Sequence, residues 1–254
     1  MFNFLHLELT SRCQKDCPMC GRRKMEREHP ELCDWGDMPL RMVYKIAEQV
    51  PKGTVVQFHN NGEPTLYNSL GTALSLFSHC IRQFNTNAKR LVEKATPIID
   101  YLDVLTISVI DNDPEQVKEV RAFEAMKGDR PPRMIYRLLG DVDHTPWKRG
   151  QIVTRTLHLP DGSRGYHKPV TIPEHGVCLD LLTHLAIDRH GDISLCVRFD
   201  PNRDLKIGNI DEMTLEEAWN SEKRQEYIKA HVQGKRASLP GCGNLCSFYG
   251  IAIG

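Results

Sequence analysis

The grouping of its nine cysteines constrains this chain more than any other feature of the sequence. Cys13, Cys17 and Cys20 lie within eight residues, Cys178, Cys196, Cys242 and Cys246 lie in the last third, and Cys33 and Cys80 stand alone. The N-terminal segment reaches Glu8 too soon for the apolar core of a signal peptide, and no apolar run is long enough to span a bilayer. We therefore expect a cytoplasmic protein, in which disulfides are rare. Grouped thiols in that compartment indicate metal ligands.

The first 140 residues alternate between strand-like runs and helical patterns, which is typical of repeated βα units and a parallel sheet. The predicted strands are 4–10, 54–58, 81–84, 104–110 and 134–139, and the predicted helices are 39–50, 66–77, 89–101 and 115–126. Because five units are too few to close an eight-stranded barrel, we expect an open, partial parallel β/α barrel. Two short strands, 185–187 and 193–195, and a helix from Thr214 to about His231 follow later in the chain.

A basic segment follows the last of these βα units. The 33 Lys and Arg of the chain balance its 33 Asp and Glu, so no global charge marks it as a binder of nucleic acid or membrane. Residues 127–168, however, hold nine Lys or Arg against four Asp, interleaved with aromatic residues. This segment is either a solvated loop surface or a pocket for a phosphorylated, otherwise anionic or nucleic-acid substrate.

The loop Cys13-Gln-Lys-Asp-Cys17-Pro-Met-Cys20 follows the first predicted strand directly. Three thiolates at this spacing can hold three corners of a cubane iron–sulfur cluster, and the fourth iron then stays open to another ligand. The alternative is a structural zinc site, which is normally four-coordinate and would need His29 or Cys33 as its fourth ligand.

Two motifs carry a family resemblance. Cys13-x3-Cys17-x2-Cys20 resembles the signature of the radical S-adenosylmethionine (SAM) superfamily, and Asn61-Gly62-Glu63-Pro64 is similar to its Gly-Gly-Glu-Pro motif. The resemblance implies a barrel of the radical SAM type, a [4Fe–4S] cluster on the three cysteines, and SAM chelated at the open iron. It also implies SAM contacts from Met19, Asn61, Gly62, Glu63, Pro64, Asn87 and Ser108.

The second cysteine group is similar to the SPASM auxiliary-cluster region in its short twitch form. The Gly191 turn between two strands is expected to bring Cys178 and Cys196 to one end of a hairpin, and Cys242 returns after the helix. The resemblance implies a second [4Fe–4S] cluster, fully ligated by Cys178, Cys196, Cys242 and Cys246, for electron transfer or scaffolding. A zinc site is the alternative.

The resemblance also implies a domain division and two further functional residues. We expect a radical SAM core over residues 1–140, a linker and substrate-facing segment over 141–177, and a twitch-like domain over 178–254. Twitch-containing dehydrogenases of aminocyclitol biosynthesis have motifs similar to Phe58-His59-x2-Gly62-Glu63-Pro64 and to Lys148-Arg149-Gly150. Arg149 is therefore expected to face the SAM or substrate pocket, and His59 either contacts substrate or is a buried strand histidine.

The predicted function is that of a radical SAM enzyme. It would cleave SAM to a 5′-deoxyadenosyl radical and remove hydrogen from a small or nucleotide-like substrate, which is then oxidised or rearranged. A reductant such as flavodoxin or ferredoxin would supply electrons. Alternatives are an isomerase that hypermodifies nucleic-acid bases, a peptide-modifying enzyme, and a non-catalytic electron-transfer protein. The start of the chain close to the first strand argues against the peptide-modifying enzyme.

Overall fold

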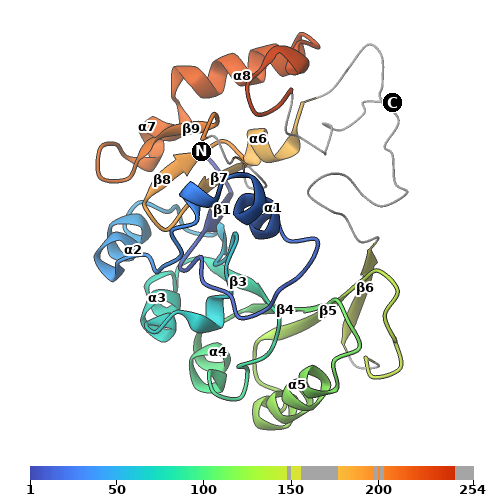
Figure 1. Ribbon diagram of the computed structural model, residues 1–254. Coiled ribbons are helices and arrows are strands. Elements are labelled where there is room, and N and C mark those ends of the chain that lie inside the picture. The colour runs from blue at the N-terminus through green and yellow to red at the C-terminus, as the bar shows by residue number, and fades with distance from the viewer. Residues whose placement is uncertain (148–149, 156–176, 197–199, 201–202, 244–254) are drawn as a thin grey trace.

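The computed structural model describes residues 1–147, 150–155, 177–196, 200 and 203–243. In these residues one mixed sheet has nine strands in the order β6-β5-β4-β3-β2-β1-β7-β8-β9 (Figure 1). Every neighbouring pair from β6 to β7 is parallel, whereas β7, β8 and β9 run antiparallel. Since β6 and β9 are its two edges, the sheet is open.

Helices separate the first five strands, and β6 follows β5 with no helix between them in the described chain. The strands are β1 (Phe4–Leu7), β2 (Val55–Gln57), β3 (Ile81–Thr86), β4 (Val104–Val109), β5 (Arg133–Leu139) and β6 (Gln151–Arg155). The helices are α1 (Gly21–Glu28), α2 (Leu40–Ala47), α3 (Leu70–Leu76), α4 (Ala95–Tyr101) and α5 (Pro114–Lys127), with 3-10 turns at Pro30–Leu32 and Pro64–Leu66. Helix α5 shows how sequence sets such bounds: the Asp113 carboxylate caps its first turn, Pro114 opens it and Gly128, with φ of +57°, ends it.

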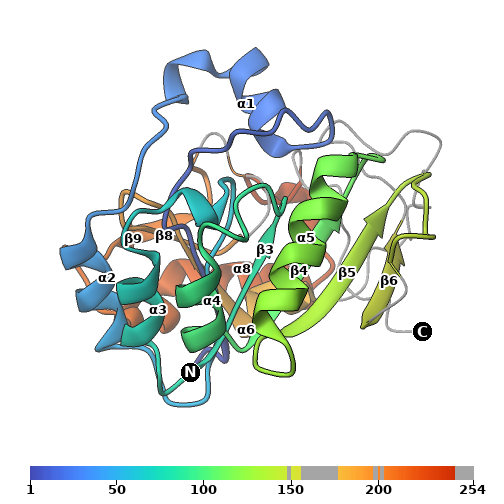
Figure 2. The same cartoon turned by 90° about the horizontal axis from the view of Figure 1, so that it is seen from below.

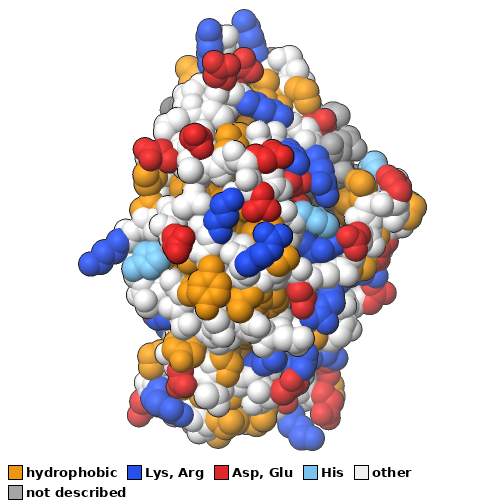
Figure 3. All heavy atoms as spheres, turned by 90° about the vertical axis from the view of Figure 1, so that its left-hand side faces the viewer, with side chains coloured by type: hydrophobic (Ala, Val, Ile, Leu, Met, Phe, Trp, Pro, Cys, Tyr) orange, Lys and Arg blue, Asp and Glu red, His pale blue; other side chains and the backbone are white. Residues whose placement is uncertain are grey.

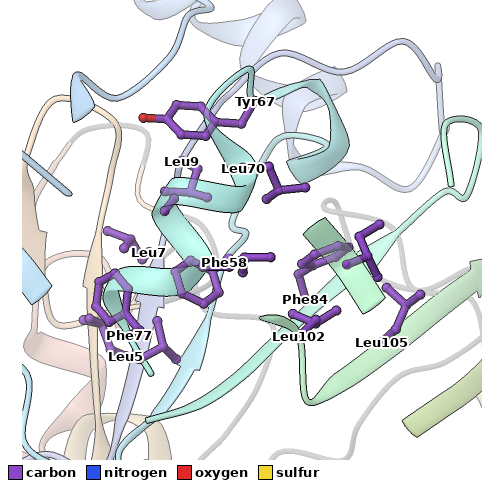
Figure 4. Packing of buried hydrophobic residues seen from close by; sticks show 14 of the residues in the cluster. Leu5, Leu7, Leu9, Phe58, Tyr67, Leu70, Phe77, Phe84, Leu102 and Leu105 are labelled. Atoms are coloured by element: carbon purple, nitrogen blue, oxygen red, sulfur yellow. The ribbon is translucent and has the colours of Figure 1, made fainter. Parts of the chain in front are cut away.

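Helices α2 to α5 cover one face of this sheet (Figure 2). Side chains alternate along a strand, so Leu5 and Leu7 of β1 point to the helical side and are fully buried there. Phe58 and Phe77 meet edge to face, with ring centroids 5.1 Å apart, in the same core (Figure 4). We call the opposite side of β1–β6 the inner face; it carries polar side chains.

The C-terminal part consists of α6 (Leu179–Thr183), β7 (His184–Ile187), β8 (Asp192–Ser194), β9 (Lys206–Asn209), α7 (Leu215–Trp219), α8 (Glu222–Val232) and a 3-10 turn at Arg236–Ser238. Strand β7 pairs in register with β1, Leu7 opposite Ile187. Gly191, with φ of +82°, turns the chain between β7 and β8. A second, small core forms here around Leu181, Leu195, Leu205 and Tyr227.

Several elements differ from the sequence-based expectation: α6 and β9 were not predicted, and three further differences have a physical reason. Strand β6 lies in the segment where we expected no regular element, because an exposed edge strand has no alternation of buried side chains. The expected helix from Thr214 to His231 is two helices, since Ser221 accepts a hydrogen bond from the Arg224 amide and starts α8 anew. Helix α1 carries six charged residues and a glycine around Met25, so it lacks the apolar stripe that identifies a helix in a sequence.

The expected fold class is confirmed: a mixed α/β chain built on an open, mostly parallel sheet. In the part of the chain that the structure describes, no helix has both the length and the apolar composition that crossing a membrane requires. On the face shown in Figure 3, basic side chains are interspersed with acidic ones.

Candidate functional site

Cys13, Cys17 and Cys20 lie on the loop that connects β1 to α1, and all three are partly exposed. The Cys20 amide donates to the Cys17 carbonyl oxygen at 3.0 Å, and α1 begins at the next residue. The predicted loop therefore exists, at the carboxyl end of a central strand. Open α/β sheets bind their ligands at this end.

Two thiols of this loop, Cys17 and Cys20, resist ionisation in the absence of a cation. Burial and, to a smaller extent, the negative charge of Cys20 raise the pKa of Cys17 to about 11. Burial also raises the pKa of Cys20, as does the charge of Cys13, whereas Arg22 and Arg23 lower it. Three thiolates this close repel one another, and a metal centre that binds all three would remove the repulsion.

Two polar contacts fix the entry to the loop. The Arg12 guanidinium donates to both carboxylate oxygens of Asp37, at 2.8 and 2.6 Å, and to the Leu66 carbonyl oxygen at 2.9 Å. The Ser11 amide donates to the Gly36 carbonyl oxygen at 2.9 Å. The loop is thereby attached to the segment that follows α1 and to the 3-10 turn between β2 and α3.

Gly62 lets the second motif approach the cysteine loop. A Cβ atom at this position would lie 1.9 Å from the Thr10 carbonyl oxygen and 3.0 Å from that of Arg12. The next residue, Glu63, donates its amide to the Arg12 carbonyl oxygen at 2.8 Å. A glycine is therefore required for this backbone contact.

The Glu63 carboxylate points into the protein. It accepts from the Thr65 amide and hydroxyl at 3.2 and 2.8 Å, from the Thr86 hydroxyl at 2.7 Å and from the Asn87 amide at 2.8 Å. Burial raises the pKa of Glu63, and these hydrogen bonds oppose the rise. Four donors occupy the carboxylate, so Glu63 joins the ends of β2 and β3, and Pro64, also buried, starts the turn that follows.

Asn87 is placed by that contact. Its side-chain amide donates to the Cys13 sulfur at 3.7 Å, and Asn87 itself is buried. Asn61, which stands where the motif usually has glycine, donates its backbone and side-chain N–H groups to the buried Glu8 carboxylate, both at 3.1 Å. Met19 lies partly exposed on the cysteine loop. The structure thus brings the residues of the two predicted motifs to one place.

Four polar side chains lie on the inner face: His59, Asn85, Ser108 and Arg137. Ser108 pairs with Arg137 across β4 and β5, and Asn85 pairs with Thr106, two residues before Ser108. His59 lies two residues after Gln57, the last residue of β2, and therefore on the same face as Gln57. The His59 ring contacts the Gln57 amide at 2.5 Å and the Asn85 amide at 3.3 Å. Burial lowers the pKa of His59 to about 3, helped by the positive charge of Arg137. His59 is therefore neutral near pH 7.

The sequence analysis missed Arg137. Its guanidinium donates to the Ser108 hydroxyl at 2.8 Å, and its Nε atom is buried with no hydrogen-bond partner in the described residues. Burial lowers the pKa of Arg137, and no described acid forms an ion pair with it. The sequence signal was the position of Arg137 in a predicted strand between the apolar residues Tyr136 and Leu138. Since these two side chains are buried, Arg137 points to the opposite side, which is the inner face.

The second cysteine group is brought together only in part. Cys178, Cys196 and Cys242 pack against the small core around Leu205. Cys246 and the predicted catalytic residue Arg149 lie outside the described residues. Nowhere in the described residues, the loop of Cys13, Cys17 and Cys20 included, do three His, Cys, Asp or Glu side chains converge as ligands of a single metal ion.

The loop suits a cluster better than one ion. A zinc ion needs four ligands at about 2.0–2.3 Å from one point, whereas thiolates at the corners of a cubane lie farther apart. Arg22 and Arg23, in the first turn of α1, each have a buried Nε atom with no hydrogen-bond partner in the described residues. An anionic iron–sulfur cluster on the loop would give these groups a negative neighbour.

Two comparisons relate this chain to known proteins. Residues 178–247 match the SPASM iron–sulfur cluster-binding domain. The fold is shared with BtrN, solved in complex with AdoMet and 2-DOIA, at a TM-score of 0.71, 18% identity and coverage of 96% of this chain and 92% of BtrN. It is also shared with anSMEcpe with bound AdoMet, at a TM-score of 0.62, 13% identity and coverage of 96% and 85%.

Together with the cysteine loop, these findings support a radical SAM enzyme with a SPASM domain over residues 178–247. They support iron–sulfur clusters and SAM as its cofactors. Over 251 residues the chain is similar to the S-adenosyl-L-methionine-dependent 2-deoxy-scyllo-inosamine dehydrogenase of Niallia circulans, at 21% identity. That alignment covers 96% of this chain and 92% of the dehydrogenase.

Proposed function

We propose that this chain cleaves SAM reductively and uses the resulting radical to oxidise an alcohol carbon of a small polar substrate. One observation carries the proposal: Cys13, Cys17 and Cys20 share one loop at the carboxyl end of β1, beside the Asn87 amide. Three thiolates would hold a [4Fe–4S] cluster with one iron open, to which SAM can bind. The similarity to a SAM-dependent dehydrogenase supports oxidation over rearrangement.

When bound, the reduced cluster and SAM supply a 5′-deoxyadenosyl radical, which removes a hydrogen atom from the substrate. The chain would position both partners. The Asn87 amide would hold Cys13, the motif 61–64 would line the cofactor beside the loop, and Met19 would lie against its adenine. The Arg137 guanidinium, already joined to Ser108 and without an acidic partner in the described residues, would bind a carboxylate such as that of SAM.

His59 would orient substrate without exchanging a proton. Its depressed pKa keeps the ring neutral, so it is a poor acid near pH 7, and a substrate hydroxyl would bind to the ring in place of the Asn85 amide. Its neighbours Gln57 and Asn85 hold the ring on the inner face. We also propose that Arg149 faces the SAM or substrate pocket.

The SPASM region would receive the electron. An alcohol that loses one hydrogen atom to the radical must release one proton and one electron to become a carbonyl. Cys178, Cys196 and Cys242 share a small apolar core, and with Cys246 they would ligate a second [4Fe–4S] cluster completely. A cluster without an open iron cannot bind substrate and is suited to electron transfer.

The experiment is an anaerobic assay with reductant, SAM and a panel of aminocyclitols and sugars. Expected are 5′-deoxyadenosine and a product lighter than the substrate by two hydrogens, in equal amounts. Cys17→Ala should abolish both. A product with the mass of the substrate would show rearrangement instead, and wild-type protein that binds iron but never cleaves SAM would refute the proposal.

A further inference from the structure

Arg22 is a buried cation next to the cysteine loop. It lies two residues after Cys20 in α1 and is 5% exposed. Its guanidinium stacks on the Trp35 ring, 4.3 Å from the centroid, and its Nη1 atom lies 3.5 Å from the Cys13 carbonyl oxygen. The stacking on Trp35 and the hydrogen bond to the loop backbone hold the charge in place.

The described residues leave this charge incompletely paired. The nearest acidic oxygen, on Glu26, is 3.7 Å from Nη2 of Arg22, whereas it lies 2.7 Å from Nη2 of Arg23. Glu26 is therefore shared, and its side chain is 30% exposed. Nε of Arg22 is buried and has no hydrogen-bond partner among the described residues. Burying a cation in this way is costly unless a negative charge lies nearby.

We propose, on the basis of the function proposed above, that Arg22 is the internal counter-charge of the cluster held by Cys13, Cys17 and Cys20 and raises its reduction potential. An external one-electron reductant adds one negative charge to the cluster. A fixed positive charge beside the cluster stabilises the reduced form more than the oxidised form. The low exposure of Arg22 limits screening of this interaction by solvent and salt.

Glu26 would act in the opposite direction. Its carboxylate lies 3.7 Å from the Arg22 guanidinium and offsets part of the Arg22 charge. Removing that carboxylate should therefore raise the reduction potential, whereas removing the guanidinium should lower it. A residue that only supports packing would not produce this pair of opposite shifts.

The test is a potentiometric titration of the full-length holoprotein, followed by electron paramagnetic resonance. The signal that changes on adding SAM identifies the N-terminal cluster. Arg22→Gln should make the reduction equilibrium about tenfold less favourable, which is ~59 mV for one electron. Arg22→Lys should lie closer to wild type, and Glu26→Gln should shift to higher potential. Arg27→Gln removes the same charge from an exposed position of α1 and should give a much smaller shift.

Equal potentials for wild type, Arg22→Gln and Glu26→Gln would overturn the inference. If Arg22→Gln fails to retain iron, the surface variant Glu26→Gln decides alone, because an unchanged or lowered potential there contradicts the role of Arg22. Failure of the proposed function looks different: wild-type protein would then show no cluster signal that responds to SAM, or no cleavage of SAM.

Discussion

The two cysteine regions of the molecule are built differently. The N-terminal cysteines share one short loop, and polar contacts hold it: the Arg12–Asp37 pair, the Ser11–Gly36 hydrogen bond and the Asn87 amide. The described C-terminal cysteines come from segments far apart in the chain and meet on an apolar core around Leu205 and Tyr227. A loop held from outside can leave one face of a cluster open to a ligand, whereas cysteines that converge from several segments can enclose a cluster completely.

The largest expected effect tests this contrast directly. Cys17→Ala should reduce SAM cleavage to background, because the reactive cluster would lose one of its three cysteine ligands. Cys196→Ala should retain formation of 5′-deoxyadenosine and lose the oxidised product, because only the exit of the electron is affected. Chromatographic quantification of both compounds checks this. Equal loss of 5′-deoxyadenosine in the two variants would contradict separate roles for the two regions.

The contact between the second motif and the loop predicts the next effect. In Gly62→Ala the new methyl group would lie 1.9 Å from the Thr10 carbonyl oxygen, so the backbone has to move. A misplacement of about 1 Å at a reacting site can cost about a hundredfold in rate, and we expect that loss in SAM cleavage. Gly53→Ala is the control away from the site: its methyl group has no neighbour within 4 Å, so it adds only the backbone strain of an alanine at a φ of +83°. Iron bound by the SPASM region should remain, and its loss would contradict a local effect.

Stability separates the two regions in a third way. Leu205, 2% exposed in the apolar core, should cost ~2–5 kcal/mol of unfolding free energy when changed to alanine. Asp37→Asn, which removes the charge from a half-exposed ion pair, should cost only about 1 kcal/mol or less. Urea titration of the anaerobic protein, followed by circular dichroism, measures both. A larger loss for Asp37→Asn would reverse our description of the two regions.

The sequence predicts those parts of the molecule in which one residue type has one physical use. Alternating βα patterns located five of the parallel strands, and the spacing of Cys13, Cys17 and Cys20 located the loop. The requirement for glycine at position 62 was visible as a motif, although the steric reason, the Thr10 carbonyl oxygen, is a tertiary contact. Local patterns were thus sufficient for the fold class and for the first set of candidate ligands.

Other features depend on contacts that a linear pattern does not contain. Strand β6 is an edge strand with mostly exposed side chains, so its apolar signal is weak. Arg22 and Arg137 are buried arginines in a chain with many surface arginines, and only Trp35 and Ser108 in space distinguish them. Glu63 was expected to contact SAM, but its carboxylate accepts four hydrogen bonds from Thr65, Thr86 and Asn87, which no linear pattern predicts.

The smallest expected effect concerns the inner face. Burial holds the pKa of His59 at about 3, below its ordinary value of about 6.5. A group with a lowered pKa in the folded state contributes stability above its unfolded pKa, and this contribution is lost as the pH falls from about 6.5 towards 3. Wild-type protein should therefore lose more stability on acidification than His59→Gln, by at most about 1.4 kcal/mol per pH unit. Urea midpoints measured between about pH 7 and pH 5 test this, and parallel curves for the two proteins would mean that the His59 ring is open to water.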